Sequence, residues 1–281
     1  MNKENPTQNN SNEIFLTRHS EAEYRTNRAI LENDPEGSLD PEDQISPDLS
    51  EKGKKLAREK AEEFFSKLNH QEDSLFFVSS NQIRAIETAN IYREVAKEKG
   101  FEILKPEHTR SEYSEDMSGG DIRVVQSLSL QVPNMIIQHV FSREEALKGV
   151  DWDKVSEETK EKWDRARKII EADDHGSWGA NYYYHSEEIK KIFPELKSAK
   201  DLDEAQFKNV LRLVKFADKK IKESGSEKKI KILGFGHENY LGVALNEYFQ
   251  DHEIKNCETV SFQVDEDNIK ASFRGQEKDI S

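Results

Sequence analysis

The sequence has almost no cysteine and no long apolar run, and both deficits narrow the class of protein. Cys257 is the only cysteine among 281 residues, so neither an intrachain disulfide nor a cysteine metal cluster is possible. No apolar stretch approaches the roughly 20 residues of a membrane span, and residues 1–12 are polar without the apolar segment of a signal peptide. We therefore expect a disordered leader over residues 1–12 and a protein of a reducing compartment, most simply the cytoplasm.

The sequence also lacks an excess of positive charge. Lysine and arginine number 42 against 56 aspartates and glutamates, which gives a formal net charge of -14. Such a balance argues against general binding to nucleic acid or to an anionic membrane. An anionic substrate would need a local cluster of cations, and the composition leaves the oligomeric state open.

Arginine and histidine residues follow the ends of three short apolar runs. The runs and the residues that follow them are Ile14–Leu16 before Arg18 and His19, Leu75–Val78 before Arg84, and Ile230–Phe235 before His237. Short apolar runs of this kind are typical of buried parallel strands. Right-handed crossovers would make the strands parallel and open all three ends onto one edge of a sheet, where ligands bind in α/β folds. We therefore expect two histidines and two arginines around one pocket.

Each of these residues taken alone has a plainer interpretation. Arg18 can be a solvated strand end, His19 a hydrogen-bonded core histidine, and Arg84 a surface arginine. Arg84, however, falls in the first turn of the helix predicted from residue 83 to about residue 99, where a cation opposes the helix dipole. Three independent coincidences at three strand ends are a poorer explanation than a shared site.

The remaining pattern predicts an α/β protein, a three-layer α/β/α sandwich with a mostly parallel central sheet. We expect one domain over residues 13–281, with a helical insertion at about 120–200 that covers the site, because strand-helix alternation is lost there. Residues 173–184 could form a lid or a packed loop. His139, His175 and His185 lie in this stretch without ligand spacing, so we expect no metal site.

Further elements follow from periodicity and turn residues. We expect a third strand at 102–104 and a hairpin formed by 260–264 and 269–273, with its turn at 265–268. Ser50 is a plausible N-cap for a helix to about residue 68. The other expected helices cover residues 142–148, 156–171, 203–223 and 240–249.

Four motifs in order resemble the histidine phosphatase superfamily, which includes the cofactor-dependent phosphoglycerate mutases. Arg18-His19-Ser20-Glu21 is similar to the signature Arg-His-Gly-Glu, and Leu49 to Gly53 to the family's Leu-Thr-x-x-Gly. Ser80 to Ala89 matches Ser-x-x-x-Arg-Ala-x-x-Thr-Ala, and His237 corresponds to the second family histidine. Asn256-Cys257-Glu258 is also similar to the family. The resemblance covers roughly residues 13–120 and 203–273.

The resemblance implies a phosphohistidine intermediate on His19, with His237 stabilising the transferring group. Arg18 and Arg84 would bind the phosphate oxygens. Either Glu115 or Glu112 would protonate the leaving group. Glu115 fits the family's Glu-x-x-x-Gly with Gly119, whereas the spacing from Arg84 equally allows Glu112. The scheme needs no cofactor and no metal. Further candidate substrate-binding residues are Arg25, Asn27 and Glu238.

Three positions depart from the family pattern. Ser20 replaces a glycine, Arg25 stands where mutases carry a phosphate-binding asparagine, and Glu238 follows the second histidine where glycine is usual. These departures favour a phosphomonoesterase acting on a small phosphorylated substrate over a mutase. An inactive relative that binds a phosphorylated ligand is the alternative from another class. The substrate itself is not identified.

Overall fold

A computed structural model describes most of the chain that carries the predicted motifs. The described residues are 13–22, 48–105, 121–125, 128, 155–172, 178–194, 199–251, 253–265 and 268–280. Several expectations therefore lie outside the described residues. They are the leader at 1–12, the helix at 142–148, the candidate site residues Arg25, Asn27, Glu112 and Glu115, and the histidines His139 and His175.

One mixed sheet of eight strands forms the centre of the described structure. Its order is β3-β2-β5-β1-β6-β7-β8, and β4 also pairs with β2. The parallel part comprises β1 (Glu13–Arg18), β2 (Asp73–Ser79), β3 (Glu102–Ile103), β4 (Ile122–Val124) and β5 (Lys229–Gly236). The antiparallel part comprises β6 (Thr259–Asp265), β7 (Asn268–Phe273) and β8 (Gln276–Asp279). The predicted mostly parallel centre and the hairpin are confirmed.

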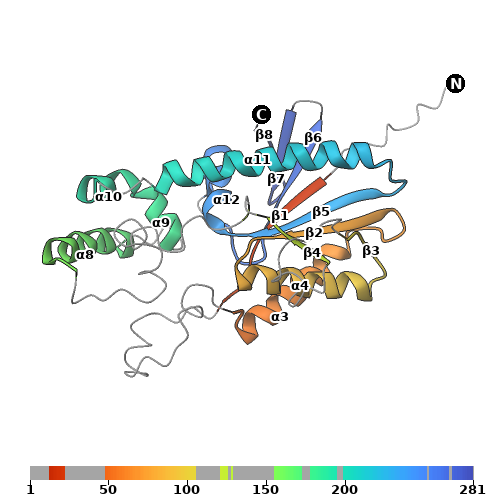
Figure 1. Cartoon of the computed structure of the whole chain (residues 1–281), viewed down its shortest axis with the longest axis horizontal. Helices are drawn as coiled ribbons and strands as arrows, with labels where there is room; N and C mark the ends of the chain where they lie inside the picture. Colours follow the sequence, from red (N-terminus) through yellow and green to blue (C-terminus); the bar gives the residue numbers. More distant parts are fainter. Residues whose placement is uncertain are drawn as a thin grey trace.

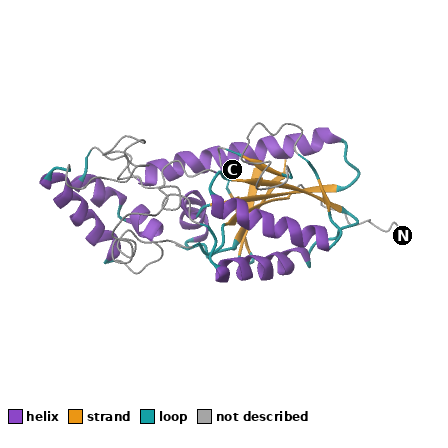
Figure 2. Ribbon diagram, turned by 60° about the horizontal axis from the view of Figure 1, so that its bottom comes forward, coloured by secondary structure: helices purple, strands orange, loops and turns teal. Residues whose placement is uncertain are grey.

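Helices cover both faces of this sheet, which confirms the three-layer prediction. α3 (Glu51–Phe65) and α4 (Ile83–Glu98) lie on one face, while α11 (Ala199–Ser224) and α12 (Glu238–Ala244) lie on the other (Figure 1). Figure 2 shows the strands enclosed between these helices. An apolar core lies on each face of the sheet, between the strands and the helices. Phe65, Phe77 and Phe235 pack in one of them, and Val214, Leu241 and Phe262 in the other.

The strand ends are fixed by tight backbone packing as well as by apolar burial. β5 is buried from Ile230 to Gly236. A Cβ atom at Gly234 would lie 2.5 Å from a methyl carbon of Leu16, so glycine leaves room for the Leu16 side chain beside β5. On the α3 side, Ser50 caps the helix as predicted, and its side chain accepts a hydrogen bond from the Gly53 N–H.

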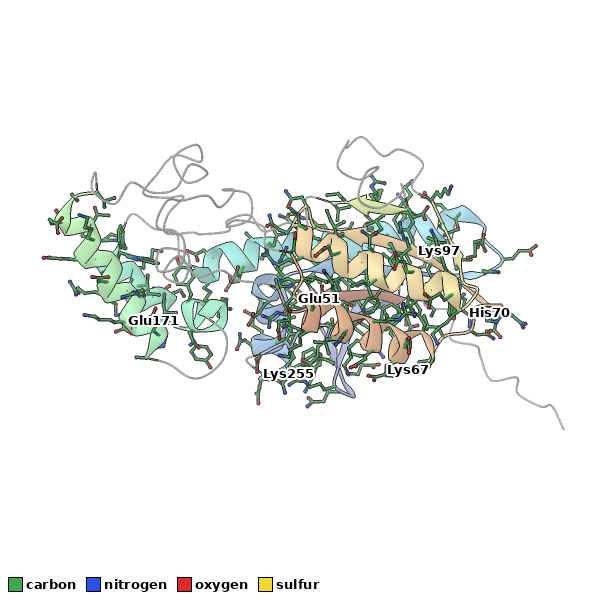
Figure 3. All side chains as sticks on the ribbon, turned by 90° about the horizontal axis from the view of Figure 1, so that it is seen from below. Glu51, Lys67, His70, Lys97, Glu171 and Lys255 are labelled. Carbon is green, nitrogen blue, oxygen red and sulfur yellow. The ribbon has the colours of Figure 1, made fainter. Side chains whose placement is uncertain are left out.

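A group of helices lies beyond the carboxyl ends of the parallel strands. It comprises α8 (Glu157–Glu171), α9 (Trp178–Tyr184) and α10 (Ser186–Ile192) (Figure 1). These three helices pack on one another, and α9 also contacts α11 and α12. Seen from below in Figure 3, Glu171 of this group lies far from His70, which is at the opposite end of the molecule.

The structure corrects four predictions. Residues 178–184, expected as part of a lid or packed loop, form helix α9 because Asn181 and Tyr182 are buried on one side of it. The range 120–200 also holds strand β4, which pairs with β2. The last helix changes to a π-helix, η3, over Leu245–Phe249, and β8 extends the hairpin to three strands.

In the described part of the chain, no helix is both long and apolar enough to cross a membrane.

Candidate active site

The two predicted histidines meet at the carboxyl edge of the sheet. Arg18 and Gly236 are paired residues of neighbouring parallel strands, so each histidine follows directly after a pair in register. The His19 N–H donates to the Gly236 carbonyl at 2.9 Å. The centroids of the His19 and His237 rings lie 5.2 Å apart with an interplanar angle of 61°. The prediction that these two side chains converge is confirmed.

Hydrogen bonds fix the tautomer of His19. Its Nδ1 lies 2.6 Å from the Ser20 carbonyl oxygen, which can only accept, so Nδ1 carries the proton. Nε2 in turn accepts a hydrogen bond from Nε of Arg84 at 3.1 Å. Burial lowers the pKa of His19 well below its usual value, and the Arg84 charge lowers it further. The ring is therefore neutral, with the lone pair of Nε2 directed to Arg84.

His237 is held against the end of β2. Its Nε2 is hydrogen-bonded to the Ser80 hydroxyl at 2.8 Å, and this hydroxyl also accepts from the Gln82 N–H at 3.2 Å. The His237 ring is buried, and its pKa lies well below the usual value because of burial and the Arg84 charge. Both imidazoles are thus neutral, because burial and the charges of the neighbouring guanidiniums each disfavour the protonated ring.

Arg18 is held from both its backbone and its side chain. The Arg18 N–H donates to the Glu258 carbonyl at 3.0 Å, and the Cys257 N–H donates to the Arg18 carbonyl at 3.1 Å. Its Nη1 donates to the Ile254 carbonyl, and its Nη2 pairs with Oε2 of Glu238 at 3.0 Å. The turn at 256–258, which resembles the family in sequence, therefore fixes Arg18.

The other motif residues contact one another next to His19. The buried Ser20, which replaces the family glycine, donates its hydroxyl to the Gly53 carbonyl at 2.7 Å. The Ser20 N–H donates to the Thr88 hydroxyl, which donates to the Arg84 carbonyl. A Cβ at Gly53 would lie 1.9 Å from the Glu21 carbonyl oxygen, so this position requires glycine. The first three motifs thus form one packed unit.

Two buried carboxyl groups, one on α11 and one on α12, lie near each other and extend from the Arg18 pair. Glu238 is the first residue of α12, and Asp203 lies on the buried face of α11, which packs against α12. Burial raises the pKa of Asp203 to about 8, and the nearby Glu238 charge adds to this shift. Tyr182 of α9 is buried beside them, and burial together with the Asp203 charge raises its pKa to about 12.

The structure brings together five of the nine predicted site residues: Arg18, His19, Arg84, His237 and Glu238. Arg25, Asn27, Glu112 and Glu115 lie outside the described residues, so their roles stay predictions. No group of three histidine, cysteine, aspartate or glutamate side chains that could hold a metal occurs among the residues described.

Sequence reasoning missed Ser80 and Asp203 as parts of this site. Ser80 had a signal, because it opens the motif that contains Arg84 and follows a strand end. Asp203 also had one: it lies four residues before Phe207 and seven before Val210, so it falls on the apolar face of its helix. A carboxylate in such a position is a candidate for a perturbed pKa.

No protein-family model matches the chain, and a search of curated proteins also finds no match. Among solved structures, a phosphoglycerate mutase from Bacillus anthracis is 14% identical, with a TM-score of 0.47 over 97% of this chain and 93% of that one. A mycobacterial glucosyl-3-phosphoglycerate phosphatase is 14% identical, with a TM-score of 0.43 over 94% and 98%. A phosphoserine phosphatase variant from Entamoeba histolytica, in complex with phosphoserine, is 11% identical, with a TM-score of 0.39 over 96% and 95%.

One of these three structures is of a mutase and two are of phosphatases. At such identities and TM-scores the likeness says nothing about the role of any single residue. What the site can do follows from its own geometry.

Proposed function

We propose that the chain is a phosphomonoesterase of the histidine phosphatase superfamily and that His19 is its nucleophile. The observation that carries this proposal is the state of His19 Nε2. Nε2 bears no proton, its lone pair accepts the hydrogen bond from Nε of Arg84, and the centroid of the His237 ring lies 5.2 Å from that of the His19 ring. A neutral imidazole nitrogen amid cations is suited to attack a bound anion, which is the covalent route open to histidine.

In the proposed reaction, the lone pair of Nε2 forms a bond to phosphorus while the bond from phosphorus to the ester oxygen breaks. The leaving oxygen takes a proton from a carboxyl group, for which Glu115 and Glu112 are the predicted candidates. Water then attacks the phosphorus, the nitrogen-phosphorus bond breaks, and inorganic phosphate leaves with His19 restored. The carboxylate formed in the first step accepts the proton of this water.

The cations would bind and stabilise the transferring group. Planar guanidiniums such as those of Arg18 and Arg84 can bind two phosphate oxygens at once, which lysine cannot do. A dianion bound beside His237 would favour the protonated ring, opposing the burial and the arginine charges that lower its pKa in the unliganded site. Positioning and charge stabilisation of this kind supply most of the catalysis in phosphoryl transfer.

The test is hydrolysis of a generic aryl phosphate by the purified chain in the presence of a chelator. We expect turnover that is lost by about 10³-fold or more in His19→Ala, because the nucleophile of a catalytic unit is removed. His70→Ala is the matched control, since His70 is exposed at the far end of the molecule (Figure 3). Mass spectrometry of protein quenched during turnover should find phosphorus on His19.

Three outcomes would contradict the proposal or change its class. Turnover that survives in His19→Ala removes His19 as the nucleophile. Transfer of the phosphoryl group to a second hydroxyl, without release of inorganic phosphate, indicates a mutase. Phosphate binding without turnover of any tested ester indicates the inactive relative.

A further inference from the structure

The Glu238 carboxylate occupies one nitrogen donor of the Arg18 guanidinium, which is expected to bind the substrate's phosphoryl group. Its Oε2 lies 3.0 Å from Nη2 of Arg18. Nη1 of the same guanidinium is used by the Ile254 carbonyl, and Nε is buried and has no hydrogen-bond partner within the described residues. A guanidinium presents Nε and Nη2 along one edge, and an oxyanion binds such an edge with two oxygens. The carboxylate thus takes half of the edge that remains.

The pair lies inside the site and is shielded from water. Side-chain exposure is 14% for Arg18 and 11% for Glu238. Glu238 directly follows His237, and Arg18 directly precedes His19, so the pair connects the chain segments that carry the two imidazoles. A pair so shielded interacts more strongly than one at the surface, because solvent screens it less.

We propose that Glu238 is a resident carboxylate that competes with the phosphoryl group for Arg18 and so lowers the affinity of the site for every phosphoryl ligand. The site then holds bare inorganic phosphate weakly and takes much of its affinity from the organic part of the substrate. This inference rests on the proposed function and adds to it. It also changes the role of Glu238 from the direct substrate contact expected from the sequence to an effect exerted through Arg18.

Repulsion between two anions at one guanidinium is the physical basis. A bound phosphate dianion and the Glu238 carboxylate would share Arg18 at short distance, so binding must weaken or break the pair. Groups near this carboxylate include Arg18 of β1, which pairs with it, and Asp203 of α11, whose pKa the Glu238 charge raises. Because Asp203 keeps its proton at neutral pH, it adds no further negative charge there.

The consequence for catalysis is weak product inhibition. A site that binds phosphate alone tightly also retains its product, and binding that is equal for substrate and transition state does not raise kcat. A competing carboxylate lowers the affinity for the phosphoryl group in every ligand. The ester is then distinguished from free phosphate by whatever its organic part contacts.

Glu238→Gln tests the proposal, because glutamine keeps the size of the side chain and removes its charge. We expect inorganic phosphate and sulfate to bind the variant about tenfold more tightly in isothermal titration, the effect of one hydrogen bond to a charged group. With an aryl phosphate, KM and the inhibition constant of phosphate should fall by a similar factor, while kcat should not rise. Glu247→Gln is the control: it removes one exposed charge from η3, and affinities should change less than about twofold.

Unchanged or weaker sulfate binding in a folded Glu238→Gln protein would overturn the inference. Glu238→Ala provides a second variant, and the circular dichroism spectrum checks that each protein is folded. If the wild-type chain hydrolyses the ester but the variants keep its phosphate affinity, only this inference fails. A wild-type chain that neither binds oxyanions nor hydrolyses esters would overturn the proposed function as well.

Discussion

The two walls of the site differ in charge but are governed by the same physics. One wall, built by the ends of β1, β2 and β5 and by α4, carries two imidazoles and the Arg84 guanidinium. The second wall, built by α12, α11 and α9, carries Glu238, Asp203 and Tyr182. On both walls a titratable group stays neutral, because burial and a nearby like charge each oppose ionisation.

The difference lies in what each wall can offer a ligand. The imidazole wall presents a lone pair and cations, and both suit a phosphoryl group. The carboxyl wall presents one ionised group paired with Arg18 and one group that keeps its proton. A ligand anion is therefore drawn to one wall and repelled by part of the other, so the walls can be tested separately.

The largest effect on activity is expected on the imidazole wall, from the substitution Arg84→Lys. The variant keeps the charge but loses the planar fork and the Nε donor to His19, so we expect kcat/KM for an aryl phosphate to fall about 10³-fold. Arg58→Lys on the exposed face of α3, where Arg58 pairs with Glu98, should change it little. Activity within tenfold of the wild type would show that the fork at residue 84 is dispensable.

The next largest effect belongs to the carboxyl wall and concerns stability. The pKa of Asp203 is about 8 in the folded chain against 3.8 for an ordinary aspartate, so the folded state binds the extra proton between these values. Folding stability should therefore fall as the pH rises through this window, by up to about 1.4 kcal/mol per pH unit from this group, and then level off.

Asp203→Asn should remove this contribution to the pH dependence. Thermal melting from about pH 5 to about pH 8 measures it, and the wild type should lose stability relative to the variant across the range. Asp201→Asn, an exposed position of the same helix, serves as the control. Parallel melting curves for the wild type and Asp203→Asn would contradict a raised pKa.

The smallest effect on activity is expected at Ser80, whose hydroxyl holds His237 on the imidazole wall. Ser80→Ala removes the hydroxyl that positions His237, so kcat/KM for the aryl phosphate should fall about tenfold, the size of one buried hydrogen bond. Ser66→Ala, an exposed helix end, should leave the rate unchanged. A loss as large as that of His19→Ala would instead mean that Ser80 takes part in the chemistry.

The sequence predicted β1, β2 and β5 and the helices that follow them because each of these strands is a largely buried apolar run that ends in polar residues. It missed β8, whose four residues are all exposed, and β4, in which Arg123 is exposed between two apolar residues. β8 has no apolar residue, and the alternation in β4 is three residues long, shorter than the roughly four to eight residues on which a strand prediction depends. Helix α9 was missed because its glycine and three tyrosines are poor helix formers, and tertiary packing of Tyr182 overrides that preference.

The histidines and arginines could be placed together because three strand ends of a parallel sheet must share an edge. The pairing of Glu238 with Arg18 could not, since it depends on side-chain directions that no spacing encodes. The same holds for the proton on Nδ1 of His19, which follows from the position of one carbonyl group. The carboxyl assigned to the leaving group stays a prediction, because Glu112 and Glu115 lie outside the described residues.

The position of β5 between β2 and β1 also governs when the site can exist. During synthesis on the ribosome, β1 and β2 emerge early, yet their shared neighbour is translated only near residue 230. Until that strand inserts, the two early strands have no common partner, and pairings between such distant segments form slowly. A nascent chain therefore carries His19 without the imidazole that faces it, and the two rings can meet only once β5 has joined β1.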